Sequence, residues 1–142
     1  MKLEIKTANK KDTKGITELY RKLYKGDEKQ GFFKSTADPS YFNSGSKVLI
    51  AKKGKDIAGF IWIVYYEHIK NKGIGIIEEL CVDTVYRRQG IGRILVKKAL
   101  KYLKGRVIVV VVTTGEEMKG AQKFYKELGF KPSREWFYIN NF

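Results

Sequence analysis

The sequence has very little cysteine and histidine, with one residue of each, Cys81 and His68. A single cysteine cannot form an internal disulfide and cannot supply a cysteine-based metal site, so we expect no metal. It also favours a reducing compartment, and we expect a cytoplasmic protein. His68 lies at the end of a predicted strand, and we assign it no role.

Long apolar runs are absent as well. The N-terminal stretch lacks the apolar segment of a signal peptide, and no segment approaches the roughly 20 residues that span a bilayer. We therefore expect no membrane partner. A length of 142 residues with 43% hydrophobic residues fits one ordinary core. We expect residues 1–142 to form a single domain.

Acidic residues are few, 15 against 29 lysines and arginines, which gives a net charge of +14. Such a charge attracts polyanions, including nucleic acid and phosphorylated cofactors, and disfavours a strongly cationic substrate. The basic residues are spread along the chain rather than run together, so we interpret most of them as a solvated surface. Nucleic acid is therefore not an expected partner.

Hydrophobic periodicity predicts alternating strands and helices. A first strand around residues 3–5 precedes a helix capped by Asp12 or Thr13. The weakly periodic segment 26–46 follows, as a short helix and a loop that face the substrate. A hairpin (48–51 and 57–66) and a strand (74–82) come next. A helix (91–103) then leads to a strand (107–112) that we expect to be buried on both faces in a parallel pair. The last elements are a helix (119–128) stopped by Gly129 and a tail (130–139) that forms a strand or a hairpin. This order predicts an α/β domain with a mixed sheet.

The strongest chemical signal lies between the strand that ends at Val82 and the helix that follows it. Arg87-Arg88-Gln89-Gly90-Ile91-Gly92-Arg93 combines two glycines, which let the backbone approach a bulky anion, with a helix N-terminus and three arginines. The pattern indicates a pyrophosphate cradle. A lone G-x-G would more often be a tight turn, and neither the P-loop nor the dinucleotide pattern fits the spacing.

Two further segments give the chain a resemblance to the GNAT superfamily of N-acetyltransferases. Arg87, Gly90 and Gly92 match its [QR]-x-x-G-x-[GA] signature. Residues 78–83 (EELCVD) resemble its fourth strand, and residues 121–130 (AQKFYKELGF) resemble its A-x-x-F-Y-x-x-x-G-F segment. The likeness is strongest from Glu78 to Phe130.

The resemblance implies a mixed, mostly antiparallel sheet flanked by helices, with central strands four and five splayed apart. It also implies that acetyl-CoA is the cosubstrate. The pantetheine arm would pair with the backbone of Leu80, Cys81 and Val82. The pyrophosphate would meet the segment of Arg87, Arg88, Gln89, Gly90, Ile91, Gly92 and Arg93.

The chemistry of amine acetylation needs a proton acceptor and a proton donor. Side chains alternate between the two faces of a strand, so we expect Glu78, Leu80 and Val82 on one face and Glu79, Cys81 and Asp83 on the other. The resemblance favours Glu78 as general base, with Glu79 or a water chain as alternatives, and Tyr125 as the acid that protonates the leaving thiolate. Direct transfer in a ternary complex is favoured over a Cys81 nucleophile.

The sequence departs from the family at two positions. Met118 replaces an asparagine that helps to hold the cofactor, which puts that contact in doubt. Thr113 replaces a glutamate of enzymes that acetylate protein N-termini, which weakens that interpretation.

Two other functions stay open: a basic nucleic-acid-binding module, and a CoA-binding sensor without turnover. The amine acceptor is not specified. The apolar tail 136–139 allows a homodimer.

Overall fold

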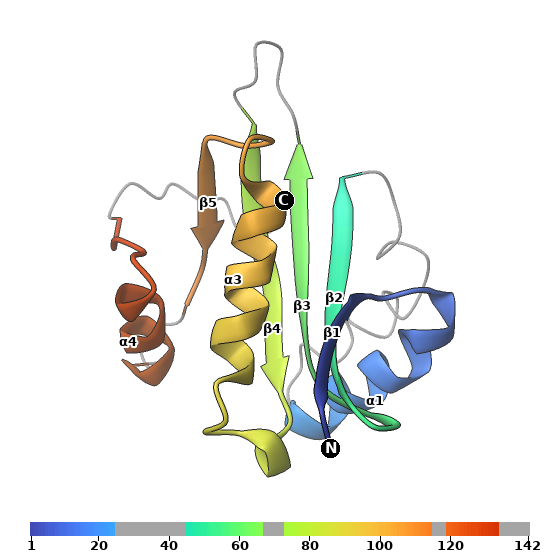
Figure 1. The fold of residues 1–142 in the computed structure, drawn as a ribbon. Coiled ribbons are helices and arrows are strands. Elements are labelled where there is room, and N and C mark those ends of the chain that lie inside the picture. The colour runs from blue at the N-terminus through green and yellow to red at the C-terminus, as the bar shows by residue number, and fades with distance from the viewer. Residues whose placement is uncertain (25–44, 67–72, 115–118, 134–142) are drawn as a thin grey trace, which may run out of the picture. The chain divides into compact units, whose positions relative to one another are not determined.

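The structure is a computed structural model that describes residues 1–24, 45–66, 73–114 and 119–133 (Figure 1). Contacts between residues divide the chain into two compact units, Met1–Val112 and Thr113–Phe142. The expectation of a single domain over residues 1–142 stays a prediction.

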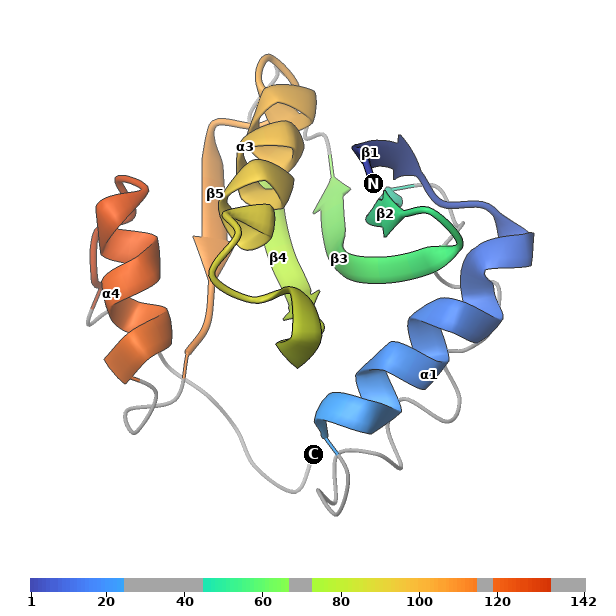
Figure 2. The same ribbon diagram turned by 60° about the horizontal axis from the view of Figure 1, so that its bottom comes forward.

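The first unit contains a five-stranded sheet whose strands follow one another in chain order. The three pairings from β1 to β4 are antiparallel, and β4 pairs with β5 in parallel. The strands are β1 (Leu3–Thr7), β2 (Ser46–Lys53), β3 (Asp56–Tyr66), β4 (Ile74–Val82) and β5 (Val109–Val112). Helices α1 and α3 lie on opposite sides of the sheet (Figure 2). The predicted α/β fold with a mixed, mostly antiparallel sheet is confirmed.

Helix α1 (Thr13–Leu23) covers one face of the sheet. Its apolar stripe joins inward side chains of β2, β3 and β4 in a buried cluster that includes Ile16, Tyr20, Phe60 and Cys81. The predicted cap by the Asp12 side chain is wrong, because Asp12 makes no capping bond to α1. Instead, Asn9 and Asp12 form a capping box around the short turn η1 (Lys10–Asp12), which leads into the helix.

Helix α3 (Ile91–Leu103), which matches the predicted bounds, covers the other face. Two strand glycines let it approach closely. A Cβ atom on Gly59 would lie 2.8 Å from the Cys81 carbonyl oxygen and 3.3 Å from Ile91 and Leu95, and one on Gly75 would lie 3.0 Å from Leu103. Both ends of α3 therefore pack against the sheet where a side chain is missing.

Strand β5 differs from the expectation of a strand buried on both faces. It begins at Val109 rather than at residue 107, and Ile108 and Val109 are 68% and 45% exposed. Within the described residues β5 is the edge strand of the sheet, so it has a pairing neighbour on one side alone.

The second unit contains helix α4 (Lys119–Glu127), which ends one residue before the predicted bound of 128. Gly129 takes the left-handed conformation (φ +94). The Phe130 and Gly129 N–H groups donate to the Tyr125 and Lys126 carbonyls at 3.0 Å each, and the Tyr125 and Phe130 rings are in contact. These features form a Schellman cap. The predicted tail strand from residue 134 on, its proposed dimer contact, and Met118 and His68 lie outside the described residues.

Candidate functional site

The pairing of β4 with β5 stops halfway along β4. The parallel ladder joins residues 74–77 to residues 109–112, and the described part of the chain places no strand beside residues 80–82 on that side. Strand β3 pairs with the other edge of this segment. An extended ligand can add to such an edge through backbone hydrogen bonds. The structure thus shows the predicted separation of the two strands at Leu80, Cys81 and Val82.

A β-bulge lies where the two strands separate. Trp62 pairs with Glu79 and the next residue, Ile63, pairs with Ile77, so Glu78 is an extra residue on β4. Bulges change the strand direction and reset the alternation of side chains. We expected Glu78 to share a face of the strand with Leu80 and Val82. Because Glu78 occupies the extra position of the bulge, the regular alternation of side chains begins at Glu79 instead. Glu78 is exposed, so water reaches its carboxylate.

Glu79 lies in a part-buried cluster on the α1 side of the sheet. The hydroxyl of Tyr24, at the end of α1, donates a hydrogen bond to Glu79 Oε1 at 2.9 Å, and the Cys81 thiol donates to the same oxygen at 3.6 Å. Tyr24 also stacks on Tyr20, with ring centroids 4.5 Å apart. The carboxylate is thus held by two donors.

The same surroundings decide the state of Cys81. Burial, the Glu79 charge and the hydrogen bond to Glu79 raise the pKa of the Cys81 thiol far above its ordinary value. Burial and neighbouring acidic groups likewise raise the pKa of the Tyr24 hydroxyl. A thiol that stays protonated is a poor nucleophile, so these surroundings argue against an acyl-cysteine intermediate.

The predicted anion loop has the backbone of an open turn. Arg88 and Gly90 both take left-handed conformations (φ +64 and +76), and no atom lies within 4 Å of the position that a Gly90 Cβ would occupy. The Ile94 N–H donates to the Gly90 carbonyl at 3.0 Å as the α3 ladder begins, so the N–H groups of the first turn precede the ladder. Arg87, Arg88, Gln89, Gly90 and Arg93 are exposed. This donor set fits a pyrophosphate.

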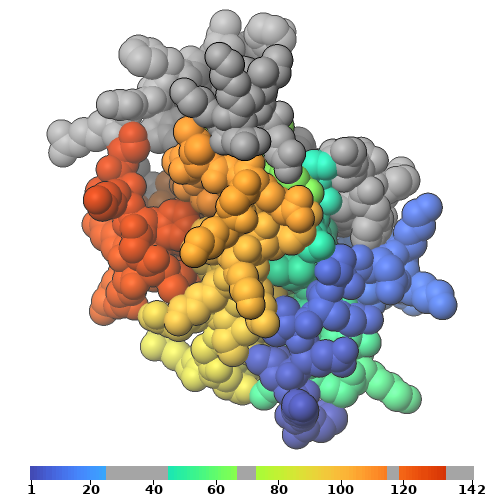
Figure 3. Space-filling view, turned by 45° about the horizontal axis from the view of Figure 1, so that its top comes forward, coloured from blue at the N-terminus to red at the C-terminus, as the bar shows by residue number. Residues whose placement is uncertain are grey.

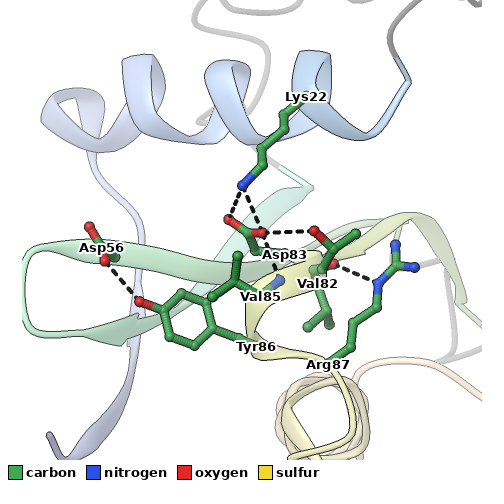
Figure 4. A network of polar contacts seen from close by, with 8 residues as sticks. Lys22, Asp56, Val82, Asp83, Val85, Tyr86 and Arg87 are labelled. Atoms are coloured by element: carbon green, nitrogen blue, oxygen red, sulfur yellow. Dashed lines mark hydrogen bonds and ion pairs between the residues drawn. The ribbon is translucent and has the colours of Figure 1, made fainter.

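Three long-range contacts hold this loop and the turn before it. Lys22 of α1 pairs with Asp83 at 2.9 Å, and the Tyr86 hydroxyl donates to Asp56 Oδ2 at 2.8 Å (Figure 4). Lys53 of β2 donates to Gln89. The loop is thus held from outside by α1 and the β2–β3 hairpin, in addition to the turn that its own glycine allows.

Asp83 links β4 to the short helix η3 (Thr84–Tyr86). Partial burial alone would raise the pKa of its carboxyl. Hydrogen bonds from Lys22 and the Val85 N–H, together with the Lys22 charge, outweigh that cost and bring the pKa below its usual range. Arg87 Nε donates to the Val82 carbonyl at 3.2 Å, so the signature arginine also bonds back to the strand end. The hydrogen bond to Asp56 raises the pKa of Tyr86.

A groove of about 600 Å³ lies beside these contacts, between α1 and the β2–β3 hairpin. Its walls mix both charge signs, with Lys22, Lys55, Asp56 and Asp83 among them. None of the predicted cofactor or catalytic residues lines its described walls. This groove is therefore separate from the opened edge of β4.

Tyr125 belongs to the second unit. It is buried, at 8% exposed, and its ring makes edge contacts with Phe124 and Phe130. Its role as proton donor stays a prediction.

Sequence reasoning missed the residues that hold the site together: Lys22, Tyr24, Asp56 and Tyr86. Their partners lie 61, 55, 30 and 30 residues away in the chain, so no local pattern marks them. Within the described residues, no group of three metal-ligating side chains is close enough to hold an ion. The helices described there are too short or too polar to cross a membrane.

Comparison with known proteins places this geometry among acetyltransferases. The model of the acetyltransferase (GNAT) family matches residues 13–130. An uncharacterized N-acetyltransferase of Methanocaldococcus jannaschii is 34% identical over 139 residues, which cover 89% of this chain and 60% of that protein. The N-alpha-acetyltransferase 30 of Xenopus laevis is 38% identical over 94 residues, 64% of this chain and 34% of that protein. The chain thus spans less than two thirds of the length of these relatives.

Solved structures share the fold. A possible acetyltransferase from Clostridium difficile 630 aligns with a TM-score of 0.85 at 18% identity, covering 99% of this chain and 97% of that one. AAC(6')-Iy, solved in complex with a bisubstrate analog of CoA and acetylneamine, aligns with a TM-score of 0.83 at 17% identity, covering 99% of both chains.

Proposed function

Because the chain belongs to the acetyltransferase (GNAT) family, we propose that it transfers the acetyl group of acetyl-CoA to a primary amine in a ternary complex. One observation supports this most strongly: the opened edge of β4 leads directly into the exposed turn with left-handed Arg88 and Gly90 at the start of α3. An edge that accepts an extended chain and a turn that accepts a pyrophosphate are the two features that CoA needs.

The residues of the first unit divide the binding between them. The backbone of Leu80, Cys81 and Val82 would pair with the pantetheine arm. The N–H groups from Arg88 to Arg93 would face the pyrophosphate, where Arg87, Arg88 and Arg93 add positive charge. Acetyl-CoA supplies a thioester carbon that bonds to the amine nitrogen as its bond to sulfur breaks.

Two side chains would move the protons. An alkylammonium with a pKa near ~10 is charged at neutral pH and must lose a proton before it attacks. The exposed Glu78 carboxylate at the bulge accepts that proton, directly or through water. The Tyr125 hydroxyl donates its proton to the departing thiolate. Cys81 takes no covalent part, because its thiol stays protonated.

A panel of amines tests this function. Simple amines, amino acids and peptides with free N-termini are each incubated with acetyl-CoA and the full chain, and thiol release is measured. We expect at least one acceptor to release thiol in step with its own acetylation. Binding of CoA without turnover on the whole panel would favour the sensor. Absence of CoA binding would remove the proposal. A cytoplasmic location stays a prediction from the single cysteine.

A further inference from the structure

The fold gathers basic side chains on the outer face of α3. The exposed residues of the helix are Arg93, Lys97, Lys98 and Lys101, and exposed Lys104 and Arg106 follow its end. Residues 84–115 contain eight lysines and arginines and no aspartate or glutamate, whereas the rest of the chain mixes both signs. Side chains of α3, yellow to orange, are in view on the surface in Figure 3. A residue pattern that looks diffuse along the chain thus becomes one positive face.

The C-terminal end of this face forms a shallow depression of about 630 Å³. Among the described residues, its walls hold no carboxylate; they are Lys98, Lys101, Tyr102, Lys104, Gly105 and Arg106. Lys47 of β2 and Arg106 both approach the Tyr102 ring, at 4.1 and 4.5 Å from its centroid. The Tyr102 and Tyr65 hydroxyls are 2.6 Å apart, which fixes the ring.

Crowding of like charges on this face costs free energy. Lys97 and Lys101 are four residues apart on the helix, and Lys101 is three residues from both Lys98 and Lys104, spacings at which like charges repel. Among the described residues, Lys98, Lys101 and Lys104 form no ion pair. An anion bound across them would relieve that repulsion.

CoA does not account for the whole face. The proposed pyrophosphate site is at residues 87–93, at the N-terminus of α3. Lys101 and Lys104 lie about ten residues further along the helix, roughly 15 Å at 1.5 Å per residue. These lysines serve neither the proposed cofactor site nor an ion pair in the described structure.

We propose that the outer face of α3, centred on Lys98, Lys101 and Lys104, binds the phosphate backbone of nucleic acid. The row from Arg93 through Lys97 to Lys101 repeats every four residues, about 6 Å, which suits a chain of regularly spaced phosphates. A helix that lies on a membrane surface typically inserts apolar side chains into the lipid. The exposed residues of α3 are all basic, and its apolar side packs on the sheet. We expected no nucleic-acid partner because the basic residues are spread along the sequence. That expectation did not take into account that the fold brings them together on one face of α3.

Two triple variants of equal net charge test this site. Lys98→Gln/Lys101→Gln/Lys104→Gln removes three charges from the face, and Lys2→Gln/Lys10→Gln/Lys55→Gln removes three exposed charges elsewhere. Binding of a fluorescein-labelled single-stranded 20-nucleotide RNA is measured from about 50 to 300 mM salt. Parallel titrations use phosphatidylserine-containing vesicles and polyglutamate.

Each released phosphate contact changes the slope of log K against log salt by about 0.7. We expect the α3 variant to lose about two units of slope and at least about tenfold in affinity, and the control variant to stay within about twofold of wild type. Both variants should keep the wild-type thermal shift with CoA.

Three outcomes would overturn the inference. The wild type fails to bind RNA at 50 mM salt; the control variant loses as much affinity as the α3 variant; or the α3 lysines are needed for vesicles or polyglutamate but not for RNA. The last result would assign the face to a membrane or an acidic protein.

Discussion

At the scale of single residues, the bulge in β4 separates two adjacent glutamates. Glu78 is exposed at the point where β4 leaves β5, whereas Glu79 receives hydrogen bonds from Tyr24 and Cys81. A base has to exchange a proton with the acceptor amine, so the exposed residue suits that role. The Glu79 carboxylate, which accepts both hydrogen bonds, suits a structural role in the part-buried cluster on the α1 side.

Glu78→Gln should lower kcat/KM by at least about 10²-fold at neutral pH and recover as pH rises toward 10, because more of the amine is then already deprotonated. Rates from pH 6 to 10 measure this. Glu79→Gln is the matched control, and we expect a smaller loss with little pH dependence. Equal, pH-independent losses of kcat/KM in both variants would mean that both carboxylates have structural roles and that neither is the base.

Tyr125→Phe separates proton donation from packing. The ring contacts with Phe124 and Phe130 remain, and the hydroxyl donor is lost. The thiolate charge develops late in the reaction, so kcat should fall by about 10²- to 10⁴-fold while the Kd for CoA changes little. Single-turnover rates and a melting curve make the comparison. A stable variant with wild-type chemistry would mean that another group protonates the sulfur.

At the scale of elements, the anion loop is held from outside by α1 and the β2–β3 hairpin. Tyr86→Phe removes the hydroxyl bond to Asp56. The turn then loses one of its outside anchors, so we expect CoA affinity to fall by about two- to tenfold. Calorimetric titration measures it. Tyr66→Phe, at an exposed end of β3, should leave affinity unchanged; an unaltered Kd in Tyr86→Phe would mean that this anchor does not shape the loop.

The Lys22–Asp83 pair predicts a pH dependence of stability. The folded pKa of Asp83 is below its unfolded value of about 3.9, so its contribution is present above that value and is lost as pH falls through the folded pKa. Because Lys22 is half exposed, the contribution should be about 1 kcal/mol or less. Lys22→Met should therefore lower the melting temperature at pH 7 but not near pH 2.

The control for this pair is Lys14→Met, which removes a 3.9 Å ion pair with Glu18 at an exposed site. We expect it to change the melting temperature little at either pH. A deficit in Lys22→Met that is as large near pH 2 as at pH 7 would show that the lysine acts through packing, not through its charge.

At the scale of the whole molecule, local signals predicted the elements and the anion loop. The α3 and α4 boundaries follow from helical periodicity and from glycine stops, and the G-x-G turn follows from residue type. The anchors of that loop join segments 30 to 61 residues apart, and the bulge at Glu78 depends on how two strands pair. Such features come from tertiary pairing, which a linear pattern does not record. The charge on α3 was visible in the sequence, but its concentration on one face was not.

The central claim is that the turn at Gly90 and the opened edge of β4 form a CoA site. The most direct test is the melting temperature of the chain with and without CoA, for the wild type, Gly90→Glu and Gly105→Glu. Both glycines have left-handed φ (+76 and +83) and open space around them, so the two substitutions impose similar strain and charge, but only Gly90 lies in the proposed site. A ligand at 100 times its Kd stabilises the native state by about 2.7 kcal/mol, which is several degrees. We predict that shift for the wild type and Gly105→Glu and none for Gly90→Glu; an unmoved wild-type curve at millimolar CoA, or an equal shift in all three, would contradict the account.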